Sequence, residues 1–407
     1  MTVGLTEIRA AAELVRGQVV RTPLVRAGRL SQMTGCELYL KLESLQATGS
    51  FKDRGAFVKL SSLDAGQRER GVIAMSAGNH AQGVAYFAQK LGIPATIVMP
   101  EFAPYLKVER TRGFGARVLL TGDTLDASAV AAREIAAKEG LAFVHPYDDE
   151  RIVAGQGTIG LELLEDLPSL EAVVVPIGGG GIMSGIALAV KALKPEIELY
   201  GVEVDRFPSM YQALRGLPAT SGGTTLADGI AVKNPGKVTL PIIRELVQEV
   251  LIVDEPAVEI AICALAEQQK LVAEGAGAAG VAAILAHPQR FAGRRVAAIL
   301  CGGNIDVRLL SAVLARGLAR DGRLVRLRVE IVDKPGVLAQ ITRVIGETGG
   351  NIIEVYHQRM FYNVPAKQAE VDVVIETKNA SHVHEIIERL NAVGLPSRVL
   401  AARSDED

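Results

Sequence analysis

Tryptophan is absent from this 407-residue chain, and aromatic residues make up only 4% of it. We therefore expect ligands to be bound through backbone turns, which the 42 glycines favour, rather than by stacking on aromatic side chains. Cysteine is also scarce. The three residues Cys36, Cys263 and Cys301 cannot form a disulfide framework, and their spacing fits no metal-ligand pattern. A reducing, cytoplasmic location is the expectation.

The chain has no excess of charge of either sign. Lys and Arg total 44, Asp and Glu total 46, and the formal net charge is −2. This balance gives no overall electrostatic attraction to nucleic acid or to an anionic membrane. Near the N-terminus, Glu7, Arg9 and Glu13 interrupt the apolar run that a signal peptide needs, so we expect a short amphipathic helix there.

Only one uncharged stretch, residues 172–190, raises the question of a membrane span. It contains Pro176 and four consecutive glycines, which a lipid-exposed helix would not favour. We interpret it as a buried strand over 172–175, a glycine loop, and a helix from about Met183. The sequence thus predicts no membrane association.

Short apolar runs alternate with Ala-rich helical patterns between about residues 35 and 310. This alternation predicts an α/β fold with one or two doubly wound parallel sheets, whose sites lie at the carboxyl ends of the strands. The predicted strands are 72–75, 95–99, 117–120, 142–144, 172–175, 199–204 and 296–300, and helices are predicted over 80–91 and 125–139.

The character of the chain changes near residue 320, where arginines surround Asp321 and Gly322. The pattern after this point predicts a separate ferredoxin-like βαββαβ domain. Its predicted elements are strands 325–332, 351–361, 370–376 and 397–401, a helix between the first two strands, and a helix over 381–393. We place a first domain over 1–319, with a smaller subdomain inserted at about 45–145, then a linker over 320–325 and the last domain over 326–407. The charged tail 403–407 is expected to be frayed.

Four motifs could carry chemistry. In QATGSFKDRG (46–55), Lys52 is either ordinary surface charge or an amine that forms a Schiff base with a carbonyl cofactor. PIGGGGIMSG (176–185) joins a strand to a helix, and it is either a tight packing turn or a loop for a single phosphate. In SAGNHAQG (76–83), Asn79 and His80 could cap and brace a helix or border a carboxylate site. In ILCGGNID (299–306), Cys301 is either a small core residue or a neutral hydrogen-bond donor.

With these motifs in this order, the chain resembles the fold type II pyridoxal-phosphate enzymes, specifically the threonine/serine dehydratases. Further matching segments are HPYDDERIVAGQGT (145–158), GVEVD (201–205), TLADGIAV (225–232) and EGAGAAG (274–280). The resemblance covers about residues 20–310, and DKPGVLAQITRVIGETGGNI (333–352) resembles an ACT domain. Together the two resemblances imply a catalytic domain with two open sheets, pyridoxal 5'-phosphate as its cofactor, and a regulatory ACT domain that follows it.

The resemblance also implies roles for individual residues. Lys52 would hold the cofactor and remove the α-proton, Asn79 would contact the ring hydroxyl, and Cys301 would lie at the pyridine nitrogen. The remaining implied cofactor residues are Phe51, Gly178, Gly179, Gly180, Gly181 and Ile182, and the implied substrate residues are Ser50, Ser76, Ala77, Gly78 and His80.

The implied reaction is deamination of L-threonine to 2-oxobutyrate and ammonia, by removal of the α-proton and β-elimination of the hydroxyl, with L-serine as a second substrate. Ala77 stands where related serine racemases carry the serine that donates a proton to the opposite face, so efficient racemisation is not expected. Glu203 matches a residue that binds a cation in some relatives. We nevertheless expect no metal, because Ser209 stands where those relatives have an Asp six residues later.

The ACT resemblance implies an amino-acid effector site and pairing between chains, so a homo-oligomer is expected. Isoleucine is the natural candidate effector if the enzyme serves isoleucine biosynthesis. The implied effector residues are Lys334, Gly336, Val337, Leu338, Asn351 and Ile352. Three alternatives stay open: a serine or 3-hydroxyaspartate dehydratase of the same fold, an ACT domain that only dimerises, and a non-catalytic amino-acid sensor.

Overall fold

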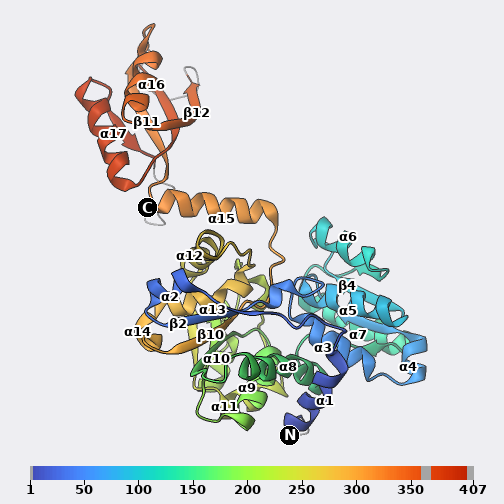
Figure 1. The fold of residues 1–407 in the computed structure, drawn as a ribbon. Helices are drawn as coiled ribbons and strands as arrows, with labels where there is room; N and C mark the ends of the chain where they lie inside the picture. The colour runs from blue at the N-terminus through green and yellow to red at the C-terminus, as the bar shows by residue number, and fades with distance from the viewer. Residues whose placement is uncertain (1–2, 359–367, 401–407) are drawn as a thin grey trace. The chain divides into compact units, whose positions relative to one another are not determined.

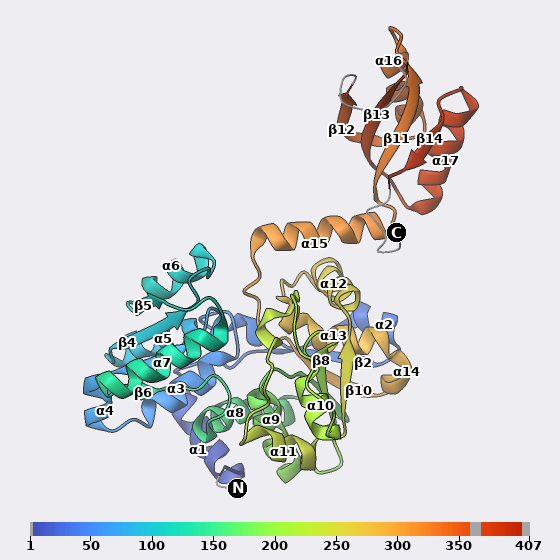
Figure 2. The same ribbon diagram turned by 180° about the vertical axis from the view of Figure 1, so that it is seen from behind.

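The computed structural model describes residues 3–358 and 368–400, and it divides into two compact units, Met1–Asp306 and Val307–Asp407. Figures 1 and 2 show the fold from opposite sides. The boundary between the two units falls before helix α15, Val307–Arg320. The linker expected over 320–325 stays a prediction.

The first unit contains a six-stranded sheet with the order β1-β2-β10-β7-β8-β9. Its strands are β1 Leu24–Arg26, β2 Glu37–Lys41, β7 Ala172–Pro176, β8 Glu198–Val204, β9 Glu249–Val253 and β10 Arg295–Ile299. All neighbouring pairs are parallel except β1 with β2. The central strand β7 is fully apolar and buried along its whole length, as expected of a strand covered on both faces.

A second, four-stranded sheet of the same unit is parallel throughout, with the order β5-β4-β3-β6. Its strands are β3 Val72–Met75, β4 Ala95–Met99, β5 Arg117–Leu120 and β6 Ala142–Phe143. Alternate residues face opposite sides: Val72 and Ala74 join one apolar cluster, whereas Ile73 joins another with Ala132. This period of two places a helix layer on each face, so the sheet is doubly wound.

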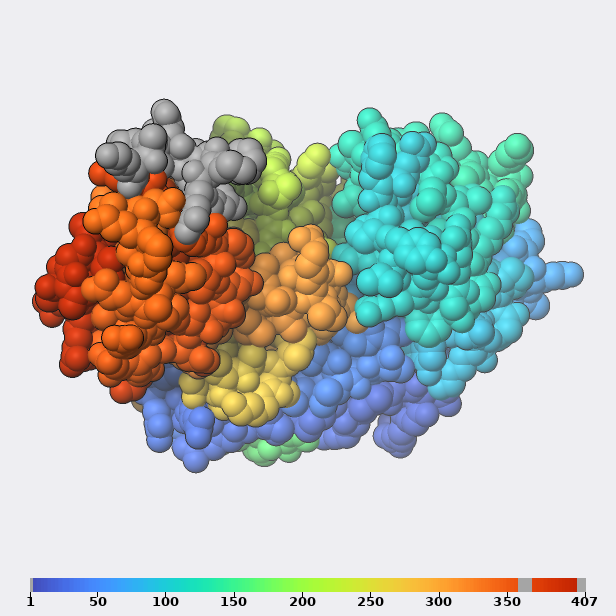
Figure 3. Space-filling model, turned by 90° about the horizontal axis from the view of Figure 1, so that it is seen from above, coloured from blue at the N-terminus to red at the C-terminus, as the bar shows by residue number. Residues whose placement is uncertain are grey.

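The helices of the first unit cover these two sheets. They are α1 Leu5–Val15, α2 Gly28–Thr34, α3 Lys52–Ser61, α4 Ala65–Arg70, α5 Asn79–Leu91, α6 Tyr105–Gly113, α7 Leu125–Glu139, α8 Glu150–Asp166, α9 Gly181–Leu193, α10 Ser209–Arg215, α11 Thr239–Leu246, α12 Glu255–Ala264, α13 Gly275–Ala286 and α14 Pro288–Phe291. Short helical turns are η1 Glu43–Leu45, η2 Asp228–Ile230 and the π-helical η3 Leu265–Gln269. Figure 3 shows the segments around α6 and α7, in cyan and turquoise, as a distinct lobe of this unit.

Helices α3 and α8 pack at very short range because glycines meet at their crossing. A Cβ atom on Gly155 would lie 2.7 Å from the Cα atom of Gly55, so neither position tolerates a side chain without displacement. The contact fixes the helix that begins with Lys52 against α8.

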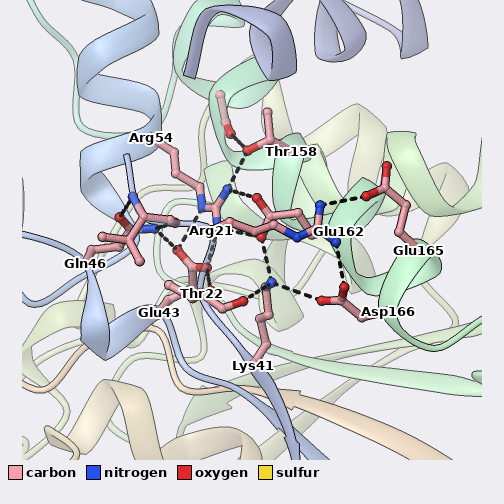
Figure 4. Close-up of polar contacts among 12 residues, drawn as sticks. Arg21, Thr22, Lys41, Glu43, Gln46, Arg54, Thr158, Glu162, Glu165 and Asp166 are labelled. Carbon is pink, nitrogen blue, oxygen red and sulfur yellow. Dashed lines mark hydrogen bonds and ion pairs between the residues drawn. The ribbon is translucent and has the colours of Figure 1, made fainter. Parts of the chain in front are cut away.

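A buried network of charged side chains also anchors α3 (Figure 4). Arg54 is fully buried and donates hydrogen bonds to both carboxylate oxygens of Glu43 and of Glu162. Lys41, also fully buried, donates to Glu162 at 2.6 Å and to the carbonyl of Thr22 at 2.6 Å. Such a network is stabilising only as a complete set, because removing one partner leaves a buried charge uncompensated.

The second unit contains an antiparallel sheet with the order β12-β13-β11-β14. Its elements are β11 Leu324–Val332, α16 Val337–Glu347, β12 Asn351–Gln358, β13 Gln368–Glu376, α17 Ala380–Ala392 and β14 Ser397–Val399. The predicted βαββαβ order is confirmed. Alternate residues of β11 are buried with apolar residues of α16 and α17, including Ile341 and Ile386.

Most predicted elements of the first unit are confirmed to within about two residues, including 125–139, which matches α7. The helix expected from Met183 begins two residues earlier, at Gly181. Lys52 is the first residue of α3. The predicted ends of two strands, Phe361 and Ala401, and the tail 403–407 lie outside the described residues. Throughout residues 3–358 and 368–400, every helix is too short or too polar to cross a membrane.

Candidate active site

The four motifs converge at the carboxyl ends of strands, where doubly wound folds place their sites. Ser76–Gly78 follows β3, Pro146 and Tyr147 lie shortly after β6, and Cys301 lies just after β10. The glycine loop follows β7.

Backbone hydrogen bonds fix the segment that carries Lys52 to the end of β10. Phe51 N–H donates to the carbonyl of Cys301 at 3.0 Å, and Ser50 forms an isolated antiparallel bridge with Gly302. Gly303 N–H donates to the carbonyl of Gly49 at 3.0 Å. The segments that carry Lys52 and Cys301 are therefore hydrogen-bonded to each other, which fixes the two residues relative to one another at the site.

The Lys52 amine is held in a sheltered place. Its Nζ donates to the carbonyl of Pro146 at 2.7 Å and lies 5.0 Å from the centre of the Phe51 ring. Burial disfavours the charged form and lowers the pKa of Lys52 from 10.5 to about 8, while nearby Cys301 and Glu274 act in the opposite direction. Near neutral pH this amine has a larger neutral fraction than an exposed lysine, which makes it a better nucleophile and base.

Ser50 and the segment after β3 line the same site. The Ser50 hydroxyl is buried and has no hydrogen-bond partner, which is unusual for a buried polar atom and suits a group that receives a ligand. Gly78 N–H is directed to the Ser76 hydroxyl at 3.1 Å. Ala77 is half-buried against apolar residues.

The His80 side chain is engaged elsewhere and does not border the expected carboxylate site. Its Nε2 lies 2.9 Å from the carbonyl of Val144, to which it must donate, and the ring is buried. Burial and the nearby Lys52 lower the pKa of His80 to about 3, so the ring is neutral. The alternative of a satisfied structural histidine thus describes the His80 side chain, and only its backbone remains to border a carboxylate.

Asn79 is fixed by two residues that the sequence did not single out. Its Nδ2 donates to Glu274 Oε1 at 2.7 Å, and its Oδ1 accepts from Asn304 Nδ2 at 2.8 Å. Asn304 also donates to the carbonyl of Thr48 at 2.7 Å. Both partners lie within matched motifs, EGAGAAG and CGGNID, but only the fold shows that their side chains meet Asn79. Asn79 is the first residue of α5, with Gly78 as its cap.

Cys301 presents a neutral thiol. It is buried, and burial together with the nearby Glu274 carboxylate raises the pKa of this thiol well above 9. A thiol that stays protonated is a weak hydrogen-bond donor and carries no charge to compensate a protonated ring nitrogen.

The glycine loop forms a narrow cradle at the start of α9. Gly180 has φ +96°, a conformation that favours glycine, and a Cβ atom there would lie 2.7 Å from Thr239 Oγ1. The carbonyl of Gly179 accepts from the same Thr239 Oγ1 at 2.6 Å, which holds the loop in place. The first N–H groups of α9 have no partner within the helix, and the positive end of its dipole favours an anion. Gly178 lies beside Val232, and Gly181 and Ile182 are buried.

These features fit pyridoxal 5'-phosphate. The Lys52 amine, with its lowered pKa, can react with the carbonyl carbon of this cofactor, and the glycine cradle can bind its phosphate. The Ser50 hydroxyl, which has no hydrogen-bond partner, can bind a ligand next to these groups. The neutral thiol of Cys301 and the amide of Asn79 are the groups available for the ring.

Glu203, the residue matched to a cation ligand, is engaged otherwise. Its carboxylate accepts from the N–H groups of Met210 and Tyr211, both at 2.8 Å, and so caps α10. Burial raises the pKa of Glu203 to about 7. Among the described residues, no group of three or more His, Cys, Asp or Glu side chains is arranged to hold a metal ion.

The residues of the implied effector site fall into two separate groups. Lys334, Gly336, Val337 and Leu338 follow the end of β11, whereas Asn351 and Ile352 begin β12. In the sheet register Asn351 and Leu324 both lie opposite Glu376, so Asn351 is level with the start of β11. The two groups are thus separated by the length of β11, roughly 27 Å at about 3.4 Å per residue.

Comparison with known proteins matches both units. Residues 15–302 match the family described as pyridoxal-phosphate dependent enzyme, and residues 321–394 match the ACT domain. The chain is 46% identical over 398 residues to the L-threonine ammonia-lyase of Thermotoga maritima, and the match covers 97% of this chain and 99% of that protein.

Solved structures show the same likeness for the first unit. The processed form of threonine deaminase isoform 2 from Solanum lycopersicum is 35% identical, with a TM-score of 0.72, and the match covers 76% of this chain and 86% of that one. Maize serine racemase is 33% identical, with a TM-score of 0.72, and the match covers 79% of this chain and 99% of that one. The shared fold therefore accommodates both elimination and racemisation, and the residues of the site must distinguish them.

Proposed function

The chain belongs to the pyridoxal-phosphate-dependent enzymes and carries a C-terminal ACT domain, and from this premise we propose that it deaminates L-threonine to 2-oxobutyrate and ammonia. The observation that carries the proposal is the near full-length similarity to an L-threonine ammonia-lyase. The feature of the structure that agrees with this similarity is the Lys52 amine, which is sheltered beside the glycine cradle and has a lowered pKa.

The described contacts support a role for each group. Lys52 would hold the cofactor carbonyl, the loop Gly178–Ile182 would hold the phosphate, and Asn79 and Cys301 would contact the ring. Ser50 and the backbone of Ser76–His80 border the substrate carboxylate. The cofactor, when bound, withdraws electrons from the α-carbon and thereby makes its proton acidic. Once the incoming substrate amine has displaced Lys52 from the cofactor carbonyl, the freed Lys52 Nζ would accept that proton as general base, and its lowered pKa suits this task near neutral pH.

Elimination is favoured over racemisation because of Ala77. Racemisation requires a second group that returns a proton on the opposite face, and an alanine side chain has no proton to donate. The neutral thiol of Cys301 favours elimination over transamination, since it does not hold the ring nitrogen protonated.

We assign regulation to the second unit and catalysis to the first. A single chain cannot bring Lys334 and Asn351 together, because they lie at opposite ends of β11 and its neighbours. Two chains paired side by side about a two-fold axis can join them, so a homo-oligomer with effector sites between ACT domains is the consistent arrangement. L-Isoleucine is the proposed effector, in a cytoplasmic enzyme of isoleucine biosynthesis. Effector and substrate would then affect each other's binding reciprocally.

The test is 2-oxo acid release by the purified protein from L-threonine, L-serine and 3-hydroxyaspartate, with and without L-isoleucine. Rapid release of 2-oxobutyrate that disappears in Lys52→Ala supports the proposal. Faster release from serine or 3-hydroxyaspartate would move the assignment to a different dehydratase. A protein that binds no cofactor and releases no oxo acid would instead be an amino-acid sensor.

A further inference from the structure

Tyr147 lies directly over the glycine cradle, and none of the roles proposed above involves its side chain. A Cβ atom built on Gly179 would lie 2.2 to 2.3 Å from three atoms of the Tyr147 ring. A Cβ atom on Gly181 would lie 3.1 Å from the backbone of the same tyrosine. The ring is therefore in contact with the loop that faces the phosphate, and glycine is required at 179 partly because of it.

The ring is held in this place from both sides. It packs edge-on against His145, with centroids 4.7 Å apart and an interplanar angle of 89°. The Tyr147 hydroxyl donates to the carbonyl of Asn234 at 3.0 Å. Asn234 belongs to the segment between η2 and α11, and nearby residues of that segment wall the loop as well, with Val232 beside Gly178. The hydroxyl thus joins two walls of the cradle.

The neutral state of His145 strengthens this anchor. Its Nδ1 accepts from the N–H groups of Tyr147 at 3.3 Å and Asp148 at 2.8 Å, so the ring proton resides on Nε2. The backbone that carries Tyr147 is therefore tied to the ring against which its side chain packs.

Tyr147 also stands next to the residue that holds the catalytic amine. Lys52 Nζ donates to the carbonyl of Pro146 at 2.7 Å, and the following residue covers the glycine loop. Two consecutive residues thus contact the two ends of the cofactor site: the amine for its carbonyl and the cradle for its phosphate.

We propose that Tyr147 closes the phosphate end of the cofactor site and slows release of the cofactor, with its bond to Asn234 as the latch. This inference rests on the proposed function for the identity of the cofactor. The ring contributes apolar contact over the loop, and the hydroxyl keeps the two walls together.

The experiment measures the dissociation constant and the release rate of pyridoxal 5'-phosphate in the full chain, by absorbance and equilibrium dialysis. Tyr147→Phe keeps the ring and loses the latch, and we expect about threefold faster release. Tyr147→Ala loses both, and we expect release and dissociation constant to rise about tenfold or more. Tyr211→Phe is the matched control, because that ring packs against Arg215. We expect no change for this control.

The outcomes separate this inference from the proposed activity. If the wild type deaminates threonine and Tyr147→Ala binds the cofactor as tightly as the wild type, the inference is wrong and the activity stands. If Tyr147→Ala changes only KM for threonine at saturating cofactor, Tyr147 borders the substrate instead, and the inference is again wrong. Should Tyr147→Ala fail to fold, Tyr147→Phe and Tyr147→Leu carry the same test.

Discussion

Asn79 and Glu274, which are 195 residues apart, are joined by a hydrogen bond of 2.7 Å from Asn79 Nδ2 to Glu274 Oε1. The bond links the start of α5, which follows a strand of the four-stranded sheet, to the start of α13, which covers the six-stranded sheet. Burial, together with the negative charge of Asp228, raises the pKa of Glu274 to about 7. This carboxyl group therefore changes charge near neutral pH, directly beside a residue assigned to the cofactor ring.

Glu274→Gln should make the protein less sensitive to pH. The unfolded carboxyl ionises near 4.5 and the folded one near 7, so wild-type stability falls as pH rises through this window. Glutamine cannot ionise, and it can still accept the bond from Asn79. We expect the variant to exceed the wild type by up to about 3 kcal/mol above the window and to equal it below.

Urea unfolding of the full chain with saturating cofactor, at pH values on either side of that window, measures this difference. Glu101→Gln, at an exposed position, is the control. Parallel pH profiles for wild type and Glu274→Gln would show that Glu274 does not titrate in this range.

Covalent capture of the cofactor by the apoprotein should accelerate as pH rises through about 8. Only the neutral amine attacks a carbonyl, and burial lowers the pKa of Lys52 to that value from 10.5. Stopped-flow absorbance after mixing with pyridoxal 5'-phosphate gives the rate, and Lys52→Ala should show no capture. A midpoint that remains near 10.5 would contradict the sheltered environment of this amine.

Arg54→Ala should destabilise the protein by about 3–5 kcal/mol, because Glu43 and Glu162 would keep their buried charge without the guanidinium. Arg21→Ala, at the exposed edge of the same network, should cost less than about 1 kcal/mol. Chemical denaturation with both variants measures the contrast. Equal losses would mean that burial does not govern this network.

Lys334→Ala and Asn351→Ala should each weaken L-isoleucine binding, and mixed oligomers of the two variants should recover part of it. The recovery follows from the register, which places the two residues at opposite ends of one sheet. A mixed pair therefore contains one site with both residues intact. Calorimetry on co-expressed, separately tagged chains measures the recovery. Mixed oligomers no better than the single variants would exclude a site shared between chains.

Local patterns predicted much of this fold because strands and helices have different periods. The short apolar strand β3, the strand β11 with its alternating burial, and the helix over 125–139 follow directly from them. Local patterns do not show where one compact unit ends: the boundary between the two units falls before α15, and the linker expected over 320–325 stays a prediction.

The sequence by itself determined the order of the motifs, and with it the family and the cofactor, and it singled out Lys52 as the residue proposed to hold that cofactor. Only the tertiary structure decided which side chains meet: Glu274 and Asn304 with Asn79, the Tyr147 ring with Gly179, and the His80 ring with the carbonyl of Val144. It also decided that Lys334 and Asn351 lie far apart. The physical reason is that such contacts depend on strand register and helix packing between segments far apart in the chain, which local composition does not encode.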